Sequence, residues 1–406
     1  MKILYYSPNP SLCLDSPSGY GTHMREMINA FRGLGHSVRE VVRGGVALRG
    51  VRSKTFNAKL KTFAKTAAPK IVWETAKDIN LAWFDYGSYI ALLKQIHEFK
   101  PDMIYERGNY LQLSGVTAAK KLGIPHVLEF NAPFVQERSS FSPFSLIQYL
   151  APKVENRQVS LTGRVVVVSS ALREFVIDVY KINPLKVIVT PNAINLEDIR
   201  ILPSLIASTK RRFDLDGKIV LGFVGSLFKW HGIDILVRAF AKVYALYPNV
   251  RLMIVGDGFL RTELEQLAAK LGLSNKVVFT GQVPHEHVFS FIEIMDIAVM
   301  ASSNWYGSPV KLFEYGAMSK PIIAPDTGPV RDVMVSGEDG ILVSADVHDL
   351  FRAIIFTIDN PGNSAAAARR FHDKVVKNHL WVNNARASID GSVCSPCQVR
   401  TGVSSG

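Results

Sequence analysis

The chain has 406 residues, of which 48% are apolar and 20% charged, with three cysteines and a formal net charge of +12. This length favours two domains over a single core, and the apolar content excludes a mainly disordered protein. Three cysteines exclude a disulfide framework and fit a reducing compartment. No apolar run reaches the roughly 18 residues of a membrane span, so we expect a cytoplasmic protein, free or attached peripherally to the inner face of the membrane.

In the first half, short apolar or β-branched runs alternate with helical patterns. This alternation predicts crossover units and a parallel sheet, which defines a first α/β domain over residues 1–194. The expected strands are Lys2–Tyr6, Val38–Val42, Met103–Tyr105, His126–Phe130, Val165–Ser169 and Val187–Thr190.

Periodicity fades over residues 195–216, which we interpret as an interdomain linker. The pattern then restarts and predicts a second parallel sheet over residues 217–362. Its strands are Ile219–Val224, Arg251–Val255, Val277–Thr280, Ile297–Ala301, Ile322–Pro325 and Ile341–Val343.

The C-terminal part changes character again. Residues 363–386 are expected to be helical, whereas the Ser/Gly/Val-rich residues 387–406 are expected to be disordered. Cys394 and Cys397 lie in that tail and lack the second pair that a zinc site requires, so no metal is predicted there.

Ligands of open parallel sheets bind at the carboxyl ends of the strands, which directs attention to the loops that follow them. The first such loop ends Ser18-Gly19-Tyr20-Gly21 at the start of a predicted helix. Gly19 there would let a phosphate approach backbone amides, although a simple turn explains the glycines as well.

The first loop of the second half contains Ser226, Lys229 and His231 and precedes a predicted helix over Ile233–Tyr247. A diphosphate would find positive charge and oriented amides there, although a loop histidine taken alone is more often structural. The next glycine loop, Gly256-Asp257-Gly258, lacks the third glycine and later acid of a dinucleotide site, which disfavours a nicotinamide enzyme.

The richest segment runs from Ser302 to Met318 and contains Lys311 and Glu314 one turn apart on a predicted helix. A carboxylate at this place can accept both hydroxyls of a ribose, and the lysine lies on the same side and can meet a phosphate. A surface ion pair between the two residues is the competing interpretation.

Together these segments resemble the retaining nucleotide-sugar glycosyltransferases of family 4, from about Met1 to Ala385. The resemblance implies the GT-B fold, in which two Rossmann-like parallel-sheet domains face each other and a C-terminal helix crosses back to the first. Within the family, the chain is similar to polysaccharide and cell-envelope transferases. The matching segments are Leu34–Val38, Val168–Leu172, Thr190–Ala193, Val255–Gly258, Phe279–Gly281, Met295–Ile297 and Glu314–Ala324.

The resemblance also implies roles for individual residues. Glu314 matches the second glutamate of the family motif and would hold the ribose, while Trp381 matches the tryptophan of the crossing helix. Backbone near Gly256 and Val283 would frame the base, and Gly19 matches a glycine of the N-terminal phosphate loop. Amides for the distal phosphate and the sugar would come from Gly307, Ser308, Pro309 and Val310.

The chain departs from the family pattern in three places. Tyr306 stands where a glutamate contacts the donor hexose, and Ser226 and His231 replace an arginine and a lysine of the phosphate clamp. Asn131 lies where many relatives have a histidine near the reacting sugar. We therefore expect Lys229 or Lys311 to supply the missing charge, His231 to donate a hydrogen bond, and Asn131 or nearby Glu129 to contact the sugar.

The resemblance implies a hexosyltransferase that uses a nucleotide sugar as substrate, with a glycan or lipid-linked sugar as acceptor and without cofactor or metal. The leaving diphosphate would take the acceptor's proton while Lys311, Lys229 and loop amides stabilise the developing charge. A sugar-nucleotide-binding protein with weak or lost catalysis is the alternative that the three departures favour.

Most of the positive charge lies outside these loops. Residues 32–77 carry eleven basic and two acidic side chains, and residues 54–68 place Phe56, Leu60 and Phe63 at helical spacing. This pattern is typical of a basic amphipathic helix on an anionic membrane near a lipid-linked acceptor. Packing of the same helix on the first domain is an equal alternative. A nucleic-acid partner is disfavoured because the aromatic residues do not interleave with the basic ones.

Overall fold

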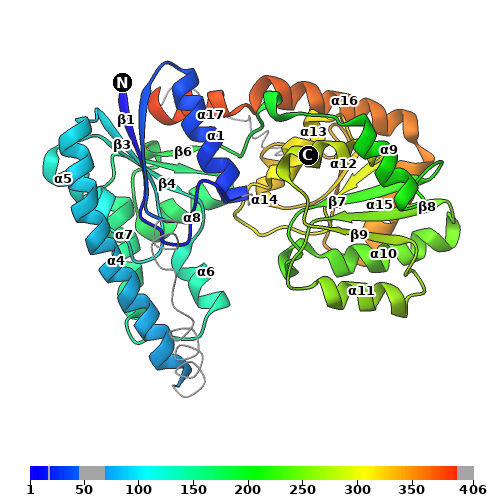
Figure 1. Ribbon diagram of the computed structural model, residues 1–406, viewed down its shortest axis with the longest axis horizontal. Coiled ribbons are helices and arrows are strands. Elements are labelled where there is room, and N and C mark those ends of the chain that lie inside the picture. The colour runs from blue at the N-terminus through cyan, green and yellow to red at the C-terminus, as the bar shows by residue number, and fades with distance from the viewer. Residues whose placement is uncertain (17–18, 45–68, 391–406) are drawn as a thin grey trace, which may run out of the picture. The chain divides into compact units, whose positions relative to one another are not determined.

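The computed structural model describes residues 1–16, 19–44 and 69–390. The chain folds as two compact units, coloured from blue to red along the sequence in Figure 1. Unit 1 contains residues Met1–Thr190 and the chain from Asn384 onward, and unit 2 contains Pro191–Asn383. The basic segment 54–68 and the pair Cys394 and Cys397 lie outside the described residues.

Unit 1 is built on a six-stranded sheet in the order β2-β1-β3-β4-β5-β6, and every neighbouring pair is parallel. Helices connect the strands, as parallel neighbours require. The strands are β1 (Lys2–Ser7), β2 (Ser37–Val42), β3 (Met103–Arg107), β4 (His126–Phe130), β5 (Arg164–Val167) and β6 (Val187–Val189). The helices are α1 (Gly19–Gly33), α4 (Lys70–Phe99), α5 (Ser114–Leu122), α6 (Phe134–Phe141), α7 (Ala151–Leu161) and α8 (Ser170–Tyr180), with short 3₁₀ turns η1 (Gln148–Leu150) and η2 (Pro184–Lys186).

Unit 2 repeats this architecture in the order β12-β11-β10-β7-β8-β9, again with parallel neighbours. Its strands are β7 (Ile219–Val224), β8 (Val250–Val255), β9 (Val277–Gly281), β10 (Ile297–Val299), β11 (Ile322–Pro325) and β12 (Ile341–Val343). Its helices are α9 (Pro203–Arg212), α10 (Ile233–Leu246), α11 (Arg261–Lys270), α12 (Val288–Ile294), α13 (Val310–Ala317), α14 (Gly328–Arg331), α15 (Val347–Asp359) and α16 (Pro361–Asn378), with turns η3 (Leu196–Asp198), η4 (Lys229–His231) and η5 (His285–His287).

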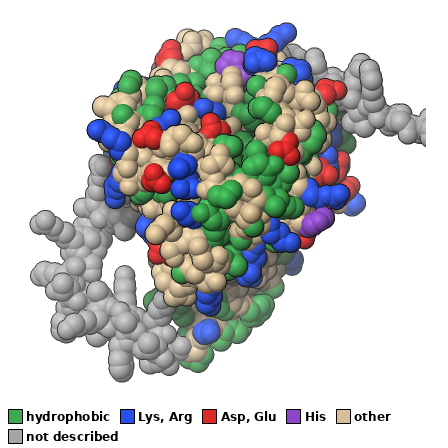
Figure 2. All heavy atoms as spheres, turned by 90° about the vertical axis from the view of Figure 1, so that its right-hand side faces the viewer, with side chains coloured by type: hydrophobic (Ala, Val, Ile, Leu, Met, Phe, Trp, Pro, Cys, Tyr) green, Lys and Arg blue, Asp and Glu red, His purple; other side chains and the backbone are tan. Residues whose placement is uncertain are grey.

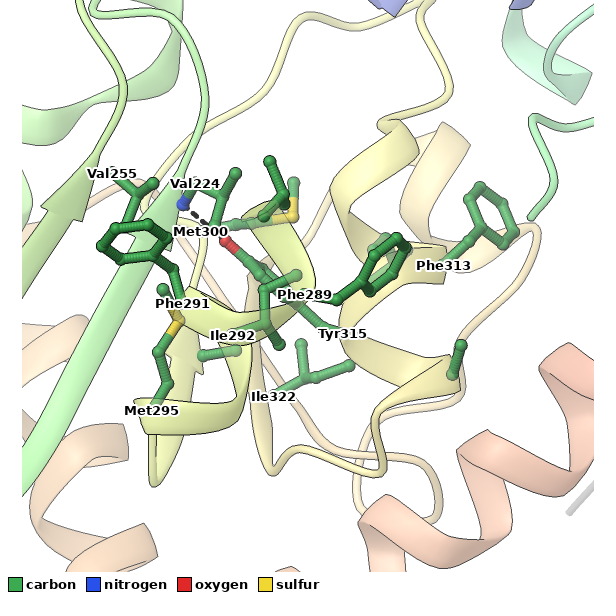
Figure 3. Close-up of a cluster of buried hydrophobic side chains, with 14 of the residues drawn as sticks. Val224, Val255, Phe289, Phe291, Ile292, Met295, Met300, Phe313, Tyr315 and Ile322 are labelled. Atoms are coloured by element: carbon green, nitrogen blue, oxygen red, sulfur yellow. Dashed lines mark hydrogen bonds between the residues drawn. The ribbon is translucent and has the colours of Figure 1, made fainter. Parts of the chain in front are cut away.

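The central strands of both sheets are buried on both faces, which is why their sequences are continuous apolar runs. In unit 2 one apolar layer contains Phe289, Phe313 and Met295, and the side chain of Tyr315 enters it from α13 (Figure 3). The Tyr315 hydroxyl accepts a hydrogen bond of 2.7 Å from the Val224 amide at the end of β7. This bond fixes α13 against the strand whose loop carries Ser226 and His231.

The predicted α/β architecture with two parallel sheets is confirmed, but the linker differs from the prediction. Residues 195–216, expected to join the domains, belong to unit 2 and contain η3 and α9. Leu205 and Ile206 of α9 pack on the core of unit 2. Few apolar residues of this helix face inward, which is why sequence periodicity does not reveal it.

The expected C-terminal helix over residues 363–386 is two helices, α16 and α17 (Trp381–Asp390), separated at His379 and Leu380. Residues 387–390, expected to belong to a disordered tail, instead complete α17, because their part of the helix packs in unit 1. There the Arg164 guanidinium donates hydrogen bonds to the carbonyls of Ser388 and Ile389. The prediction that the C-terminal helix returns to the first domain is therefore confirmed.

Within the described ranges no helix combines the length and hydropathy required to span a bilayer. On the face that Figure 2 presents, basic and acidic side chains are interspersed with apolar ones.

Candidate active site

The strand order of unit 2 reverses between β7 and β10, so the loops that follow these two strands leave the sheet in diverging directions. In open parallel sheets this switch point is where ligands bind. The loop after β7 begins at Gly225 and contains His231, and the chain after β10 leads to α13 with Lys311 and Glu314. Three residues predicted from two separate segments of the sequence thus lie at one edge of the sheet.

Two glycines make the close packing at this edge possible. Gly256 follows β8 with φ of 132°, and a Cβ there would lie 2.1 Å from the Gly225 carbonyl oxygen. Gly225 has φ of 143°, and a Cβ there would lie 2.9 Å from the Lys311 Nζ. Gly256 therefore lets the two loops touch, and Gly225 leaves room for the ammonium group. Gly256 has this packing role whatever it contributes to a base.

Lys311 is buried in the first turn of α13 with 8% of its surface exposed. Its ammonium lies 4.7 Å from the centre of the Phe223 ring and 3.4 Å from Nδ1 of His231. Burial lowers the pKa of Lys311 to about 8, and the nearby Glu314 carboxylate opposes that shift. The lysine is thus a buried cation at neutral pH with only weak partners.

Glu314 lies one turn further along α13 and is also 8% exposed. Burial raises the pKa of its carboxyl to about 7, and the charge of Lys311 opposes the rise. Within the described part of the chain the carboxylate takes part in no hydrogen bond and no ion pair within 4.0 Å. The surface ion pair considered from the sequence is therefore wrong, because both residues are buried and do not contact each other directly.

His231 ends the short turn η4 and lies beside Lys311. Burial, and then the charge of Lys311, lower the pKa of the imidazole to about 2, so the ring is neutral. An ammonium group only donates hydrogen bonds, so Nδ1 accepts from Lys311 and Nε2 carries the proton. His231 therefore presents an N–H donor without adding charge.

The loop before α13 is held by two asparagines that sequence patterns did not single out. Asn192 donates its backbone amide to the Ser308 hydroxyl at 2.9 Å and its side-chain amide to the Ser308 carbonyl at 2.6 Å. Asn304 accepts the Gly307 amide at 2.6 Å. The Thr190–Ala193 motif was the available signal for Asn192, but it carried no assigned role.

These contacts reduce the number of backbone amides in residues 307–310 that can donate to a phosphate or a sugar. The Gly307 N–H is occupied by Asn304, and Pro309 has no N–H to offer. The amides of Ser308 and Val310 remain at the positive N-terminal end of α13. Two of the four predicted donors therefore do not fit that role.

The other predicted residues of unit 2 lie at the margins of this edge. Ser226 and Lys229 are exposed on the loop after β7, and Val283 is half-buried and packs on the core. No described hydrogen bond or ion pair places Lys229 beside Lys311 and His231. The structure therefore brings together Lys311, Glu314 and His231 and leaves Lys229 in solvent.

Unit 1 has its own buried polar cluster at the carboxyl ends of β3 and β4. Glu129 lies near the end of β4 beside Arg107, which ends β3, and the two form an ion pair. His23 of α1 places its Nε2 3.1 Å from the same carboxylate oxygen, and the Asn131 side-chain amide also donates to it. One oxygen of Glu129 thus interacts with three side chains.

The electrostatics of this cluster follow from those contacts. Burial alone raises the pKa of Glu129, but the charges of His23 and Arg107, with hydrogen bonds from His23 and Asn131, outweigh it and hold the pKa at about 2. The second carboxylate oxygen and the Asn131 Oδ1 are buried and have no hydrogen-bond partner among the described residues. Glu129 also raises the pKa of the buried Tyr105 hydroxyl, after burial itself, so this ring lies close to the carboxylate.

Gly19 lies at the start of α1, where it is exposed, and a Cβ there would meet no atom within 4 Å. The constrained glycine of this loop is Gly21, where a Cβ would lie 2.2 Å from the Ser16 carbonyl oxygen. The sequence pattern could not tell which of the two glycines the backbone requires. Within the described ranges no three His, Cys, Asp or Glu side chains are grouped so as to hold a metal ion.

Comparison with known proteins places both units in one enzyme class. Residues 17–198 match the family model described as Glycosyltransferase Family 4, and residues 207–374 match the model described as Glycosyl transferases group 1. The two matches together contain every strand of the two sheets except β1, and they include His23, Glu129, His231 and Glu314.

Individual relatives are distant. The chain is 29% identical over 227 residues to the phosphatidylinositol N-acetylglucosaminyltransferase GPI3 subunit of Saccharomyces cerevisiae strain YJM789, covering 56% of this chain and 50% of that protein. It is 31% identical over 225 residues to the D-inositol 3-phosphate glycosyltransferase of Acidothermus cellulolyticus, covering 51% and 49%. The chain spans about half the length of these relatives.

Solved structures extend the similarity to the whole fold. The crystal structure of HepE from Anabaena in complex with UDP and glucose matches with a TM-score of 0.71 at 18% identity, over 97% of this chain and 100% of that one. The lipopolysaccharide glycosyltransferase WaaG matches with a TM-score of 0.65 at 14% identity, over 96% and 100%. At these identities the likeness shows a shared GT-B fold.

Proposed function

The chain belongs to the glycosyltransferases of family 4, and we propose that it transfers a hexosyl unit from a nucleotide sugar to a glycan or lipid-linked acceptor with retention of configuration. The observation that carries this proposal is the pair Lys311 and Glu314, a buried cation and a buried carboxyl that do not contact each other. A nucleotide sugar supplies partners for both, because its diphosphate satisfies the ammonium and its ribose hydroxyls satisfy the carboxylate.

The neighbouring groups suit the leaving diphosphate. Lys311, the Nε2–H of His231 and the first-turn amides of α13 are all donors, so they stabilise negative charge as the glycosidic bond breaks. The diphosphate itself then takes the proton from the attacking hydroxyl on the same face of the sugar. This route requires neither a metal nor a separate general base in unit 2.

Unit 1 supplies groups of the opposite kind. The second oxygen of Glu129 and the Asn131 Oδ1 accept hydrogen bonds, as sugar hydroxyls require. We propose that they contact the transferred sugar or the acceptor. The basic segment 54–68, which lies outside the described residues, stays a prediction for docking near a lipid-linked acceptor.

A panel of nucleotide sugars in a thermal-shift assay tests the donor, because a ligand that binds only the folded protein raises its melting temperature. UDP-sugars come first, since the matched HepE structure contains UDP. We expect Glu314→Gln and Lys311→Ala to weaken donor binding by about 1.5–3 kcal/mol each, roughly 10- to 150-fold, which is the usual cost of a lost charged hydrogen bond.

The matched controls are Glu263→Gln and Lys270→Ala, which change exposed residues of α11. They should bind the donor like the wild type. Unchanged donor binding in both site variants would refute the assignment. Donor binding without transfer to any acceptor would favour the alternative, a sugar-nucleotide-binding protein.

A further inference from the structure

Asn192 is the second residue of unit 2, in the segment where the chain leaves unit 1. Two residues before it, the Thr190 amide donates to the Val167 carbonyl at the end of β5 at 2.8 Å. Two residues after it, the amide of the buried Ile194 donates to the His379 carbonyl at 2.9 Å. Backbone hydrogen bonds on both sides therefore fix the position of Asn192 independently of the loop that precedes α13.

Asn192 contacts that loop through two hydrogen bonds that both end on Ser308. Its side-chain amide donates to the Ser308 carbonyl, and its backbone amide donates to the Ser308 hydroxyl oxygen. The two bonds hold one residue by its main chain and by its side chain, so they fix the position of the Ser308 hydroxyl. Only the first bond requires a carboxamide at position 192, because the second uses the backbone.

The hydroxyl proton of Ser308 has no acceptor among the described residues. Ser308 is 7% exposed, and its hydroxyl oxygen accepts the Asn192 N–H. An N–H group cannot accept in return, so the proton points towards a different group. The only other hydrogen bond of Ser308 in the described part of the chain is the one to its carbonyl. Since buried donors are normally satisfied, this O–H is available to a ligand.

Ser290 of α12 shows the arrangement in which the fold uses both sides of a buried hydroxyl. Its oxygen accepts the Leu202 amide at 2.9 Å, much as Ser308 accepts the Asn192 amide. Its proton is donated to the Arg200 carbonyl at 3.4 Å. Both serines are buried and both accept a backbone N–H, but only Ser290 also has an acceptor for its proton within the described residues. The difference indicates that Ser308 donates to a bound molecule.

The Ser308 hydroxyl lies next to the groups assigned to the diphosphate. Ser308 directly precedes Pro309, the N-cap of α13, and Val310 and Lys311 follow in the first turn. Pro309 offers no N–H and no polar side chain, so the Ser308 O–H adds a donor at this end of the helix. A phosphate oxygen there is a charged acceptor, which makes a hydrogen bond from a hydroxyl stronger than one between neutral groups.

We propose that the Ser308 hydroxyl donates to the diphosphate of the nucleotide sugar and that Asn192 is the positioning residue that holds the hydroxyl in place. The inference rests on the proposed function, because it requires a nucleoside diphosphate at this edge of unit 2. It assigns Ser308 a side-chain donor in addition to its backbone amide, and it assigns Asn192 a role that acts through Ser308.

Binding of UDP and of uridine tests the proposal, because only UDP carries the diphosphate. We expect Ser308→Ala to lower the affinity for UDP about tenfold in calorimetric titration, as for one hydrogen bond to a charged group. Its affinity for uridine, measured by ligand-observed NMR, should stay that of the wild type. Asn192→Ala should lower the affinity for UDP by up to the same factor. The double variant should bind UDP no more weakly than Ser308→Ala, because Asn192 acts through the hydroxyl.

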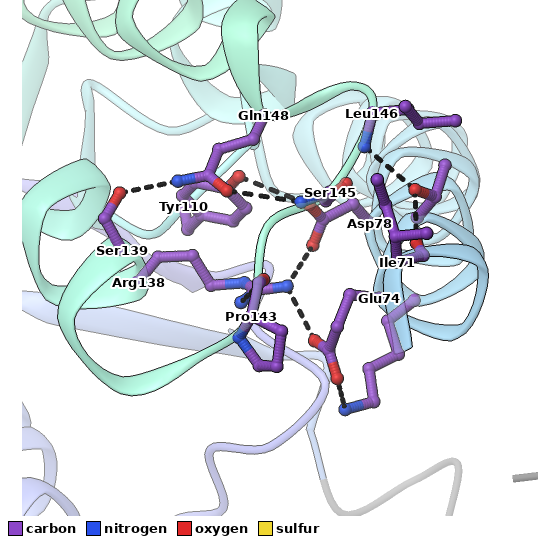
Figure 4. A network of polar contacts seen from close by, with 12 residues as sticks. Ile71, Glu74, Asp78, Tyr110, Arg138, Ser139, Pro143, Ser145, Leu146 and Gln148 are labelled. Carbon is purple, nitrogen blue, oxygen red and sulfur yellow. Dashed lines mark hydrogen bonds and ion pairs between the residues drawn. The ribbon is translucent and has the colours of Figure 1, made fainter. Parts of the chain in front are cut away.

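The matched controls remove a serine and a carboxamide whose partners are structural. Ser290→Ala removes the hydroxyl that joins α12 to Leu202 and Arg200, and it should lower the melting temperature but bind UDP like the wild type. Gln148→Ala removes a half-buried side-chain amide in unit 1 that donates to the Ser139 hydroxyl and accepts the Ser145 backbone amide (Figure 4). It should also bind UDP like the wild type.

The outcomes separate this inference from the proposed function. Wild-type affinity for UDP in Ser308→Ala would overturn the inference and leave the proposed function standing. Equal losses for UDP and uridine would give Ser308 a structural role only and would also overturn it. An additive loss in the double variant would remove the positioning role of Asn192. GDP or ADP, each with its nucleoside, replaces UDP if the wild type binds it more tightly. A wild type that binds none of the three would refute the proposed function and this inference together.

Discussion

Glu129 in unit 1 and Glu314 in unit 2 are both buried glutamates at the carboxyl ends of parallel strands or just beyond them, but their surroundings differ. Glu129 contacts His23, Arg107 and Asn131, and its pKa is lowered to about 2. Glu314 has no direct hydrogen bond among the described residues, and burial raises its pKa to about 7. One charge is stabilised by the protein and the other is not.

The fold itself fixes and neutralises the charge of Glu129, whereas Lys311 and Glu314 need a ligand to satisfy their charges. The cations around Glu129 are supplied by the fold, so the charge of Glu129 contributes to the stability of unit 1. The charges of Lys311 and Glu314 cost free energy until a ligand partners them. The comparison predicts that changes at Glu129 act mainly on folding and changes at Lys311 and Glu314 mainly on donor binding.

The largest expected effect is on the unfolding of unit 1. Glu129→Ala leaves Arg107 and His23 buried next to each other without the carboxylate, and removal of one partner from a buried pair costs about 3–5 kcal/mol. Denaturant unfolding measures the loss. The control Glu174→Ala removes an exposed glutamate of α8 and should be close to neutral. A loss below about 1 kcal/mol in Glu129→Ala, the size expected of an exposed pair, would end the distinction between the two glutamates.

The pH dependence of donor binding is the next largest effect. Binding requires Glu314 ionised and Lys311 charged, so affinity should peak between about pH 7 and pH 8 and fall by up to roughly tenfold per pH unit on each side. Calorimetric titration over about pH 5–10, which brackets both pKa values, measures both limbs. Glu314→Gln should remove the acid limb and retain the alkaline one, and an acid limb that persists in this variant would exclude Glu314 as its origin.

The stability of the ligand-free protein should follow the opposite pattern. The folded pKa of Glu314 is raised above its unfolded value of roughly 4.3, so its contribution to stability is lost as pH rises towards 7. The folded pKa of Lys311 is lowered from roughly 10.4, so stability is regained as pH rises above about 8. Melting temperatures without donor should therefore pass through a shallow minimum where donor binding is strongest.

Much of the fold could be predicted because buried parallel strands have continuous apolar sequences. Each of the twelve predicted runs overlaps an observed strand, and four of them, such as Ile219–Val224, have the observed bounds. Helix α9 could not be predicted, because few of its residues are buried. The exposure of apolar residues of α4 such as Trp83 and Tyr86 could not be predicted either, because their spacing is also that of a core-facing helix.

The site was predictable where residue type alone determines the chemistry, as for Lys311 and Glu314. The site was not predictable where contacts between distant parts of the chain determine which groups are already hydrogen-bonded. No local pattern indicates that Asn304 occupies the Gly307 amide or that Asn192 holds Ser308 from a distant part of the sequence. The pairing of His23 with Glu129 also depends on the sheet order, because β1, which leads into α1, lies next to β3 and only one strand away from β4.

The smallest predicted effect tests the neutral member of the site in unit 2. Because His231 is neutral throughout the working pH range, His231→Asn, whose shorter side chain lacks the Nε2 position, should remove one hydrogen bond from a neutral donor to the diphosphate. The expected loss is about 1.5 kcal/mol, or roughly tenfold in donor affinity, which is the lower end of the range for a hydrogen bond to a charged group. Both limbs of the pH profile should keep their positions, and the control His348→Asn, which changes an exposed residue of α15, should match the wild type.

A displaced acid limb in His231→Asn would show that the imidazole titrates with the donor. The charge in unit 2 would then be shared between His231 and Glu314, and the contrast with the fixed cations around Glu129 would no longer hold.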